Sequence, residues 1–150
     1  MIMKKFFLLL AAIIMTASVV LADDNIVEIP FKKVPDLGQR TVTSYFPNNT
    51  VVKCVKDKSK DMKNHTCVLL DNGATLEFDK DGHWMIVDCR DSDNTIPMRM
   101  INGKIQMFLS KNYPDIDVVF MGREIKNGDI TLLLKDGTEL HFTNENEIIR

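Results

Sequence analysis

The second half of the chain shows two successive hydrophobic patterns. Between residues 98 and 109, apolar residues recur every three or four positions, which is the spacing of one face of a helix. Tyr113 ends this segment, because a residue that precedes a proline avoids helical backbone angles. Apolar and β-branched residues then alternate in short runs, separated by Asn-Gly and Asp-Gly dipeptides that are typical of tight turns. The pattern predicts a helix that begins near Pro97, followed by three strands at residues 116–121, 130–134 and 140–142.

The first half of the chain follows the same plan, which indicates a duplication. Ile29-Pro30 returns as Ile96-Pro97, and residues 69–78 return in similar form as residues 133–142. A repeat with matching turn signals is typical of one supersecondary unit used twice. In this half we expect a helix at residues 35–46 and strands at residues 51–55, 66–70, 76–78 and 84–87.

These elements predict an α+β fold of tandem duplicated units, each a helix plus an antiparallel β-sheet. The helices would pack on one face of the sheet, because they are too few to cover both faces. Residues 23–95 would form the first unit and residues 96–150 the second, together making one compact domain. The alternation turns Leu69, Thr131 and Leu133 away from the helices. They mark either a recognition surface or merely isolated exposed side chains, which are common.

The first 22 residues predict a secretory signal peptide. Lys4 and Lys5 precede an apolar stretch at residues 6–20, and small residues lead to a cleavage position after Ala22. The mature protein is therefore expected in the periplasm or outside the cell, with no membrane segment after cleavage.

The charge of the mature chain excludes some classes of partner. Without the signal peptide, 17 Lys and Arg residues face 21 Asp and Glu residues, a formal charge of −4. Nucleic acids and anionic membranes both require clustered positive charge. We therefore expect no nucleic-acid partner.

Three cysteines remain after export, and an odd number leaves at least one unpaired. Cys54 and Cys67 flank a predicted hairpin, so a disulfide between them is a candidate if both side chains share one face. The pairing of Cys89 and the oligomeric state stay open.

The order and spacing of these motifs resemble the PepSY-like family of secreted and periplasmic proteins, which are described as β-lactamase-inhibitor-like. The resemblance extends over nearly all of the mature chain. It implies two PepSY-like repeats, an architecture similar to β-lactamase inhibitor protein, a periplasmic location and no catalytic site. It is carried by Phe46-Pro47, Asn72-Gly73, Asp81-Gly82, Trp84, Tyr113-Pro114 and Asp136-Gly137.

The sequence contains no recognisable catalytic constellation. The three His residues lack the paired spacing of zinc proteases, and no Gly-rich phosphate loop or nucleophile elbow is present. The chain is therefore not expected to be an enzyme or to carry a cofactor. The alternative is calcium binding by Asp79 and Asp81 or by Asp91 and Asp93, although such residues also build ordinary turns.

The leading hypothesis is a non-catalytic binding or inhibitor-like module that recognises a protein or peptide of unknown identity. Trp84 is the expected aromatic anchor, because tryptophan is enriched at binding hot spots. A single tryptophan is also often just part of a core. Leu69, Thr131 and Leu133 would complete the surface.

Overall fold

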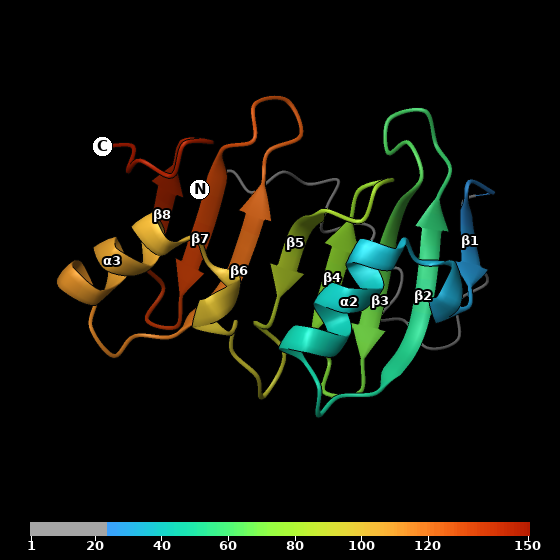
Figure 1. The fold of residues 1–150 in the computed structure, drawn as a ribbon, viewed down its shortest axis with the longest axis horizontal. Coiled ribbons are helices and arrows are strands. Elements are labelled where there is room, and N and C mark those ends of the chain that lie inside the picture. The colour runs from blue at the N-terminus through green and yellow to red at the C-terminus, as the bar shows by residue number, and fades with distance from the viewer. Residues whose placement is uncertain (1–23) are drawn as a thin grey trace.

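The fold is an antiparallel sheet of eight strands that follow one another in sequence order (Figure 1). The computed structural model describes residues 24–150, so the predicted signal peptide lies outside the described residues. The strands are β1 (Ile26–Ile29), β2 (Val51–Asp57), β3 (His65–Leu70), β4 (Thr75–Phe78), β5 (Trp84–Asp88), β6 (Val118–Arg123), β7 (Ile130–Leu134) and β8 (Glu139–Phe142).

The helices of the described chain are short. They are α2 (Asp36–Tyr45) and α3 (Gly103–Asn112), with two single 3₁₀ turns, η1 (Phe31–Lys33) and η2 (Met98–Met100). The helix predicted from Pro97 begins later than expected. Residues after Pro97 form only the η2 turn, and Asn102 caps the true helix by accepting a hydrogen bond from the Lys104 backbone N–H at 2.9 Å.

The predicted fold class, tandem duplicated helix-plus-sheet units, is wrong. The described chain is mostly one continuous eight-stranded sheet with two ten-residue helices. The strands join across the expected boundary because β5 pairs directly with β6, through Ile86 with Gly122, Val87 with Met121 and Asp88 with Phe120. Hydrophobic alternation shows which residues share a face, but it does not show which strand lies beside which.

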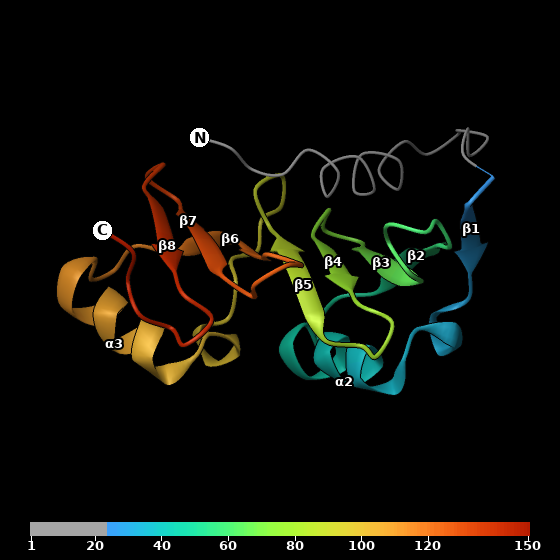
Figure 2. The ribbon, with the colours of Figure 1, turned by 90° about the horizontal axis from the view of Figure 1, so that it is seen from above.

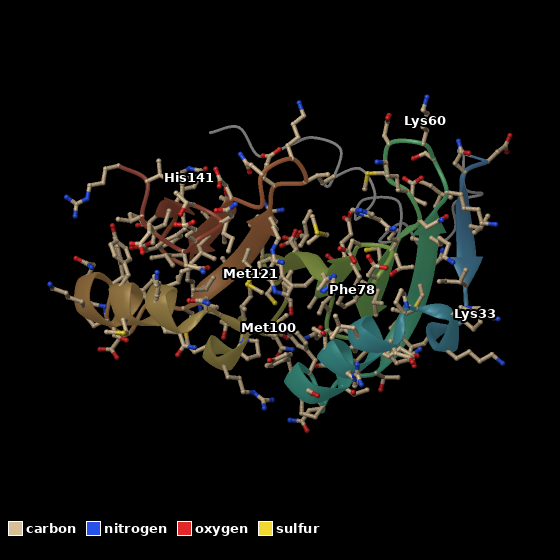
Figure 3. The ribbon with its side chains drawn as sticks, turned by 45° about the horizontal axis from the view of Figure 1, so that its top comes forward. Lys33, Lys60, Phe78, Met100, Met121 and His141 are labelled. Atoms are coloured by element: carbon tan, nitrogen blue, oxygen red, sulfur yellow. The ribbon has the colours of Figure 1, made fainter. Side chains whose placement is uncertain are left out.

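Both helices lie on the same side of the sheet, with α2 over the earlier strands and α3 over the later ones (Figure 2). Val42 of α2 and Ile105 and Leu109 of α3 belong to one core cluster with Val68 and Leu132 of the sheet. The cluster runs through the middle of the molecule, where Phe78, Met100 and Met121 also lie (Figure 3). One hydrophobic core therefore serves both halves of the chain.

The opposite face of the sheet carries smaller clusters. Leu69 packs with Ile26, Val55 and Cys67. Leu133 packs with a second group, Met62, Ile86 and Phe120.

The chain turns back on itself after β8. Phe142 forms an antiparallel bridge with Ile148, and the Ile149 N–H donates to the His141 carbonyl at 2.8 Å. The final residues thereby lie along β8.

Candidate functional site

A cleft of about 470 Å³ lies between the sheet and the segment that holds η2 and the start of α3. Its lining includes Met100 and Ile105 from the helix layer and Trp84, Met121 and Arg123 from the sheet. This volume falls within the range typical of ligand-binding clefts, which are mostly apolar with a few polar groups. Sequence reasoning missed the cleft, because its walls come from segments that only the fold brings together.

Trp84 begins β5 and turns its ring toward the helix side of the sheet. The register pairs it with Phe78, after an irregularity that follows Glu77 on β4. The indole is half-buried, and the Arg123 guanidinium carbon lies 4.1 Å from its ring centroid. This is a close cation–π contact, which stabilises both side chains at the cleft.

Arg123 ends β6 and is half-buried beside Trp84. Burial lowers the pKa of its guanidinium, and the more distant charge of Asp79 opposes that shift only in part. The second cation of the cleft, the exposed Arg99, donates to the Ser44 carbonyl and lies 5.0 Å from the Tyr45 ring centroid. The lining of the cleft thus places two positive charges together, one of them over the ring of Trp84.

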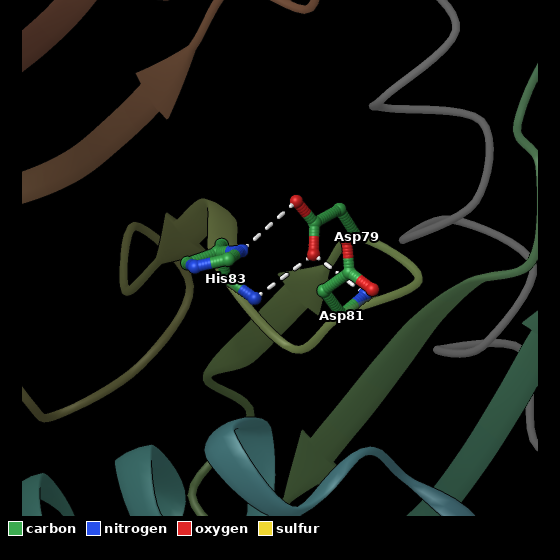
Figure 4. Close-up of side chains that lie close together, drawn as sticks. All are labelled: Asp79, Asp81 and His83. Atoms are coloured by element: carbon green, nitrogen blue, oxygen red, sulfur yellow. Dashed lines mark hydrogen bonds and ion pairs between the residues drawn. The ribbon is translucent and has the colours of Figure 1, made fainter.

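The turn between β4 and β5 brings Asp79, Asp81 and His83 together (Figure 4). One ligand atom from each lies within 4.8 Å of the others. Asp79 Oδ1 accepts the backbone N–H groups of Asp81 and His83, both at 2.9 Å, and Asp79 Oδ2 lies 3.4 Å from His83 Nδ1. One Asp79 oxygen is therefore already used in building the turn.

The two acidic clusters proposed as alternative calcium sites lie at opposite ends of β5. Asp79 and Asp81 precede β5, whereas Asp91 and Asp93 follow it, so five strand residues separate the two pairs. Strand geometry places these ends about 17 Å apart. Calcium prefers six to eight oxygen ligands, and an imidazole nitrogen such as that of His83 suits zinc or copper better.

The remaining predicted binding residues lie on the helix-free face and do not line the cleft. Leu69 and Leu133 belong to different clusters, and both are half-buried. The Thr131 hydroxyl lies 3.2 Å from His141 Nδ1. Trp84 is on the other side of the sheet, so the four residues proposed from sequence do not form one site.

The structure does not contain the predicted Cys54–Cys67 disulfide. Cys54 pairs across the strands with Val68, and Cys67 pairs with Val55. The two cysteines are thus one position out of register and point to opposite faces of the sheet. Cys54, Cys67 and Cys89 are all free and buried.

A buried polar pair on the helix-free face was not predicted. His65 Nδ1 lies 3.2 Å from Glu77 Oε1, and both side chains are almost fully buried. Burial raises the pKa of the Glu77 carboxyl, although the bond to His65 opposes this shift. The alternation of residues on β3 and β4 places both side chains on one face, and this pattern was the sequence signal from which the pair could have been predicted.

Comparison with known proteins identifies relatives of the chain. Residues 63–150 match a family described as "Putative beta-lactamase-inhibitor-like, PepSY-like". No curated protein sequence matches the chain. Among the described residues, neither helix has the length and apolar character needed to cross a membrane.

Three solved structures resemble the fold closely. A "putative periplasmic protein" of Bacteroides vulgatus has 28% identity and a TM-score of 0.77, covering 85% of this chain and 96% of its own. A "putative calcium-regulated periplasmic protein" of Bacteroides thetaiotaomicron has 30% identity and a TM-score of 0.75, with the same two coverages. A further Bacteroides vulgatus protein, described as of unknown function, has 23% identity and a TM-score of 0.74, covering 83% of this chain and 97% of its own.

The resemblance predicted from the sequence motifs is therefore confirmed, and the chain belongs to the PepSY-like, β-lactamase-inhibitor-like family.

Proposed function

We propose that this chain is an exported, non-catalytic binding module that holds a protein or peptide partner in the cleft beside Trp84. The observation that carries the proposal is the contact between Trp84 and Arg123 in the lining of the cleft. Tryptophan and arginine are the residues most enriched at the energetic centres of protein interfaces. An indole held in place by a cation loses little side-chain freedom on binding, which favours affinity.

The periplasm is the proposed location of this module. The predicted signal peptide supports export, and two structural neighbours are described as periplasmic proteins. The inhibitor-like description of the family is consistent with a protein that acts by contact. A fold shared with an inhibitor does not by itself establish inhibition, because function resides in sites and not in folds.

The proposal is tested by placing a photo-crosslinking amino acid at Asn144, an exposed residue of the cleft lining, so that Trp84 stays in place, and exposing the mature chain to periplasmic extract. The crosslinked partner is then purified and its affinity measured for wild type, Trp84→Phe and Trp84→Ala. Loss of the indole is expected to weaken binding at least tenfold, with Trp84→Phe intermediate, because hot-spot truncations typically cost about 2 kcal/mol or more.

Leu133→Ala is the matched control, since Leu133 lies on the opposite face of the sheet. Unchanged affinity in Trp84→Ala with a native melting midpoint would contradict a site in the cleft. Weaker binding in Leu133→Ala alone would place the site on the helix-free face.

A second candidate function is regulation by a divalent cation. It is favoured by the turn that gathers Asp79, Asp81 and His83 and by the calcium-regulated description of one neighbour. A bound ion raises the free energy of unfolding by mass action, by about 2.7 kcal/mol when the ion is at one hundred times its dissociation constant. The melting midpoint rises as a result. Melting curves with millimolar calcium, with zinc and with EDTA, for wild type and Asp81→Asn, test this candidate. Identical midpoints under all conditions would eliminate it.

A further inference from the structure

The cleft is positively charged although the mature chain is acidic overall. Arg99 and Arg123 are the charged residues of its lining, and the other polar members are the amides Asn102, Asn144 and Asn146. No carboxylate belongs to the described lining. A local field of one sign inside a low-dielectric cleft attracts a ligand of the opposite sign.

Arg123 has cationic capacity that the described chain does not use. The carbon of its guanidinium lies over the Trp84 ring, but no hydrogen bond or ion pair within the described residues engages its N–H groups. Stacking on an aromatic ring leaves the in-plane donors of a guanidinium accessible, and these match the two oxygens of a carboxylate.

Arg90, in the turn that follows β5, is an arginine whose donors are bonded to a carboxylate. Its Nε and Nη2 atoms donate to the two carboxylate oxygens of Asp88, at 2.9 and 2.7 Å, while its guanidinium stacks 4.7 Å from the Phe120 ring centroid. Arg123 has the same aromatic support beside Trp84, but it lacks the carboxylate. Asp79 acts on Arg123 only from a distance, and a half-buried guanidinium without a directly bonded carboxylate is energetically costly, so a ligand that supplies a carboxylate gains affinity.

We infer that the cleft selects peptide segments in which an acidic side chain is flanked by apolar ones. The carboxylate would bind Arg123, and the apolar neighbours would pack against the half-buried indole of Trp84 beside it. The amides at the rim offer both donors and acceptors, as a peptide backbone requires. This inference rests on the proposed function, because it names the chemistry of the partner for the same cleft. A polyanion such as nucleic acid fits poorly, since the mature chain as a whole is negative.

Trp84 fluorescence provides the readout, because it is the single tryptophan of the chain. The probes are pools of N-acetylated, C-amidated hexapeptides, randomised over Leu, Phe, Ser and Gly, with one fixed position as Glu, Gln or Lys. A fourth pool has Gln at the fixed position and a free C-terminal carboxylate. The Glu pool is expected to act at roughly tenfold lower concentration than the Gln pool, because a charge-assisted hydrogen bond is worth more than a neutral one.

The variants Arg123→Gln and Arg40→Gln separate the cleft from general charge. Both remove one positive charge, but Arg40 is exposed on α2 and does not line the cleft. Arg123→Gln should abolish the preference for Glu, whereas Arg40→Gln should retain it, and raised salt should reduce it.

The outcomes separate the two proposals. Equal responses to the Glu, Gln and Lys pools would overturn the acidic preference and leave the cleft as a peptide site. A response to the free C-terminus alone would overturn the acidic side chain as the carboxylate source. No response to any pool at millimolar concentration would overturn the inference, while the crosslinking at position 144 would still decide whether the cleft binds a protein.

Discussion

The buried thiols have a direct chemical consequence at the scale of the residue. Burial raises the pKa of Cys54 and of Cys89 to about 12, and nearby carboxylates, Glu28 and Asp88 respectively, add to the shift. Only the thiolate reacts with alkylating agents, and at pH 8 about one thiol in ten thousand would be ionised at that pKa. Native Cys54 and Cys89 are therefore expected to resist iodoacetamide.

Mass spectrometry after alkylation, with and without denaturant, measures this resistance. The denatured chain should take up three labels without prior reduction, because all three cysteines are free. The rate of native labelling should rise about tenfold for each pH unit up to pH 12, as long as the fold persists. Fast labelling of native Cys54 or Cys89 at pH 8, or fewer than three labels after unfolding, would contradict the structure.

The sequence indicated which residue types could take part in a site, but not which residues would lie beside them. Trp84 stands out in the sequence as the one tryptophan of the chain, yet only the structure places it in a cleft on the helix side. Arg123 could not be predicted, because an arginine at the end of a strand has no sequence signal until its neighbour is known. Cys54 and Cys67 were paired by proximity along the chain, whereas the register puts them on opposite faces.

At the scale of the element, the β4–β5 turn depends on Gly82. This residue has a φ of +91°, and a Cβ placed on it would lie 2.8 Å from the Gly38 backbone nitrogen and 3.0 Å from Leu37 Cβ at the start of α2. Gly137 has a nearly identical φ of +93°, but a Cβ placed on it would meet nothing within 4 Å. The two glycines share a backbone conformation that strains L-residues, and they differ in what a side chain would meet.

Gly137→Ala should lower the free energy of unfolding by about 1–2 kcal/mol, which is the cost of the left-handed region for an L-residue. Gly82→Ala should cost about 1–3 kcal/mol more, because the methyl group presses against α2. Urea unfolding of both variants measures the difference. Equal destabilisation would show that the turn does not rest on the helix.

The positions of the helices could be predicted best where a proline gives a clear local signal for a helix end. The first helix, expected at residues 35–46, occupies Asp36–Tyr45, and Phe46 and Tyr113 close the two helices as their prolines require. The second helix starts later than predicted because Asn102 caps its first turn through a side-chain hydrogen bond, which Pro97 cannot provide. The short strand β1 was missed, since four residues show too little alternation to be distinguished from a loop.

At the scale of the whole molecule, the shared core predicts a single cooperative unfolding transition. Helix α3 lies toward the β8 end of the sheet, away from α2 (Figure 1), yet Leu109 of α3 packs in the same cluster as Val42 of α2. Leu109→Ala is expected to cost about 2–5 kcal/mol. It should lower the midpoint seen by Trp84 fluorescence and the midpoint seen by circular dichroism by the same amount.

Met107→Ala is the control on the same helix, because its side chain is 75% exposed and its removal should change stability little. If Leu109→Ala shifted the circular dichroism midpoint but left the Trp84 transition in place, the two halves would unfold separately.

The sequence predicted which residues share a face of the sheet, but it did not predict how the strands pair across the whole molecule. Alternation correctly turned Leu69, Thr131 and Leu133 away from the helices, because face assignment needs only a period of two. The pairing of β5 with β6 decided between two units and one sheet, and it depends on contacts between segments far apart along the chain. The cleft depends on that same pairing, which is why neither could be anticipated.

The return of the chain along β8 bears on solubility. An open sheet ends in two edge strands, and unpaired backbone groups on such edges invite other chains to add to the sheet. At one edge, the bridge from Phe142 to Ile148 and the Ile149 hydrogen bond occupy backbone groups of β8. The segment around Ile148 and Ile149 therefore reduces the number of β8 backbone groups that another chain could pair with. Removing this segment is expected to favour aggregation before it weakens the core.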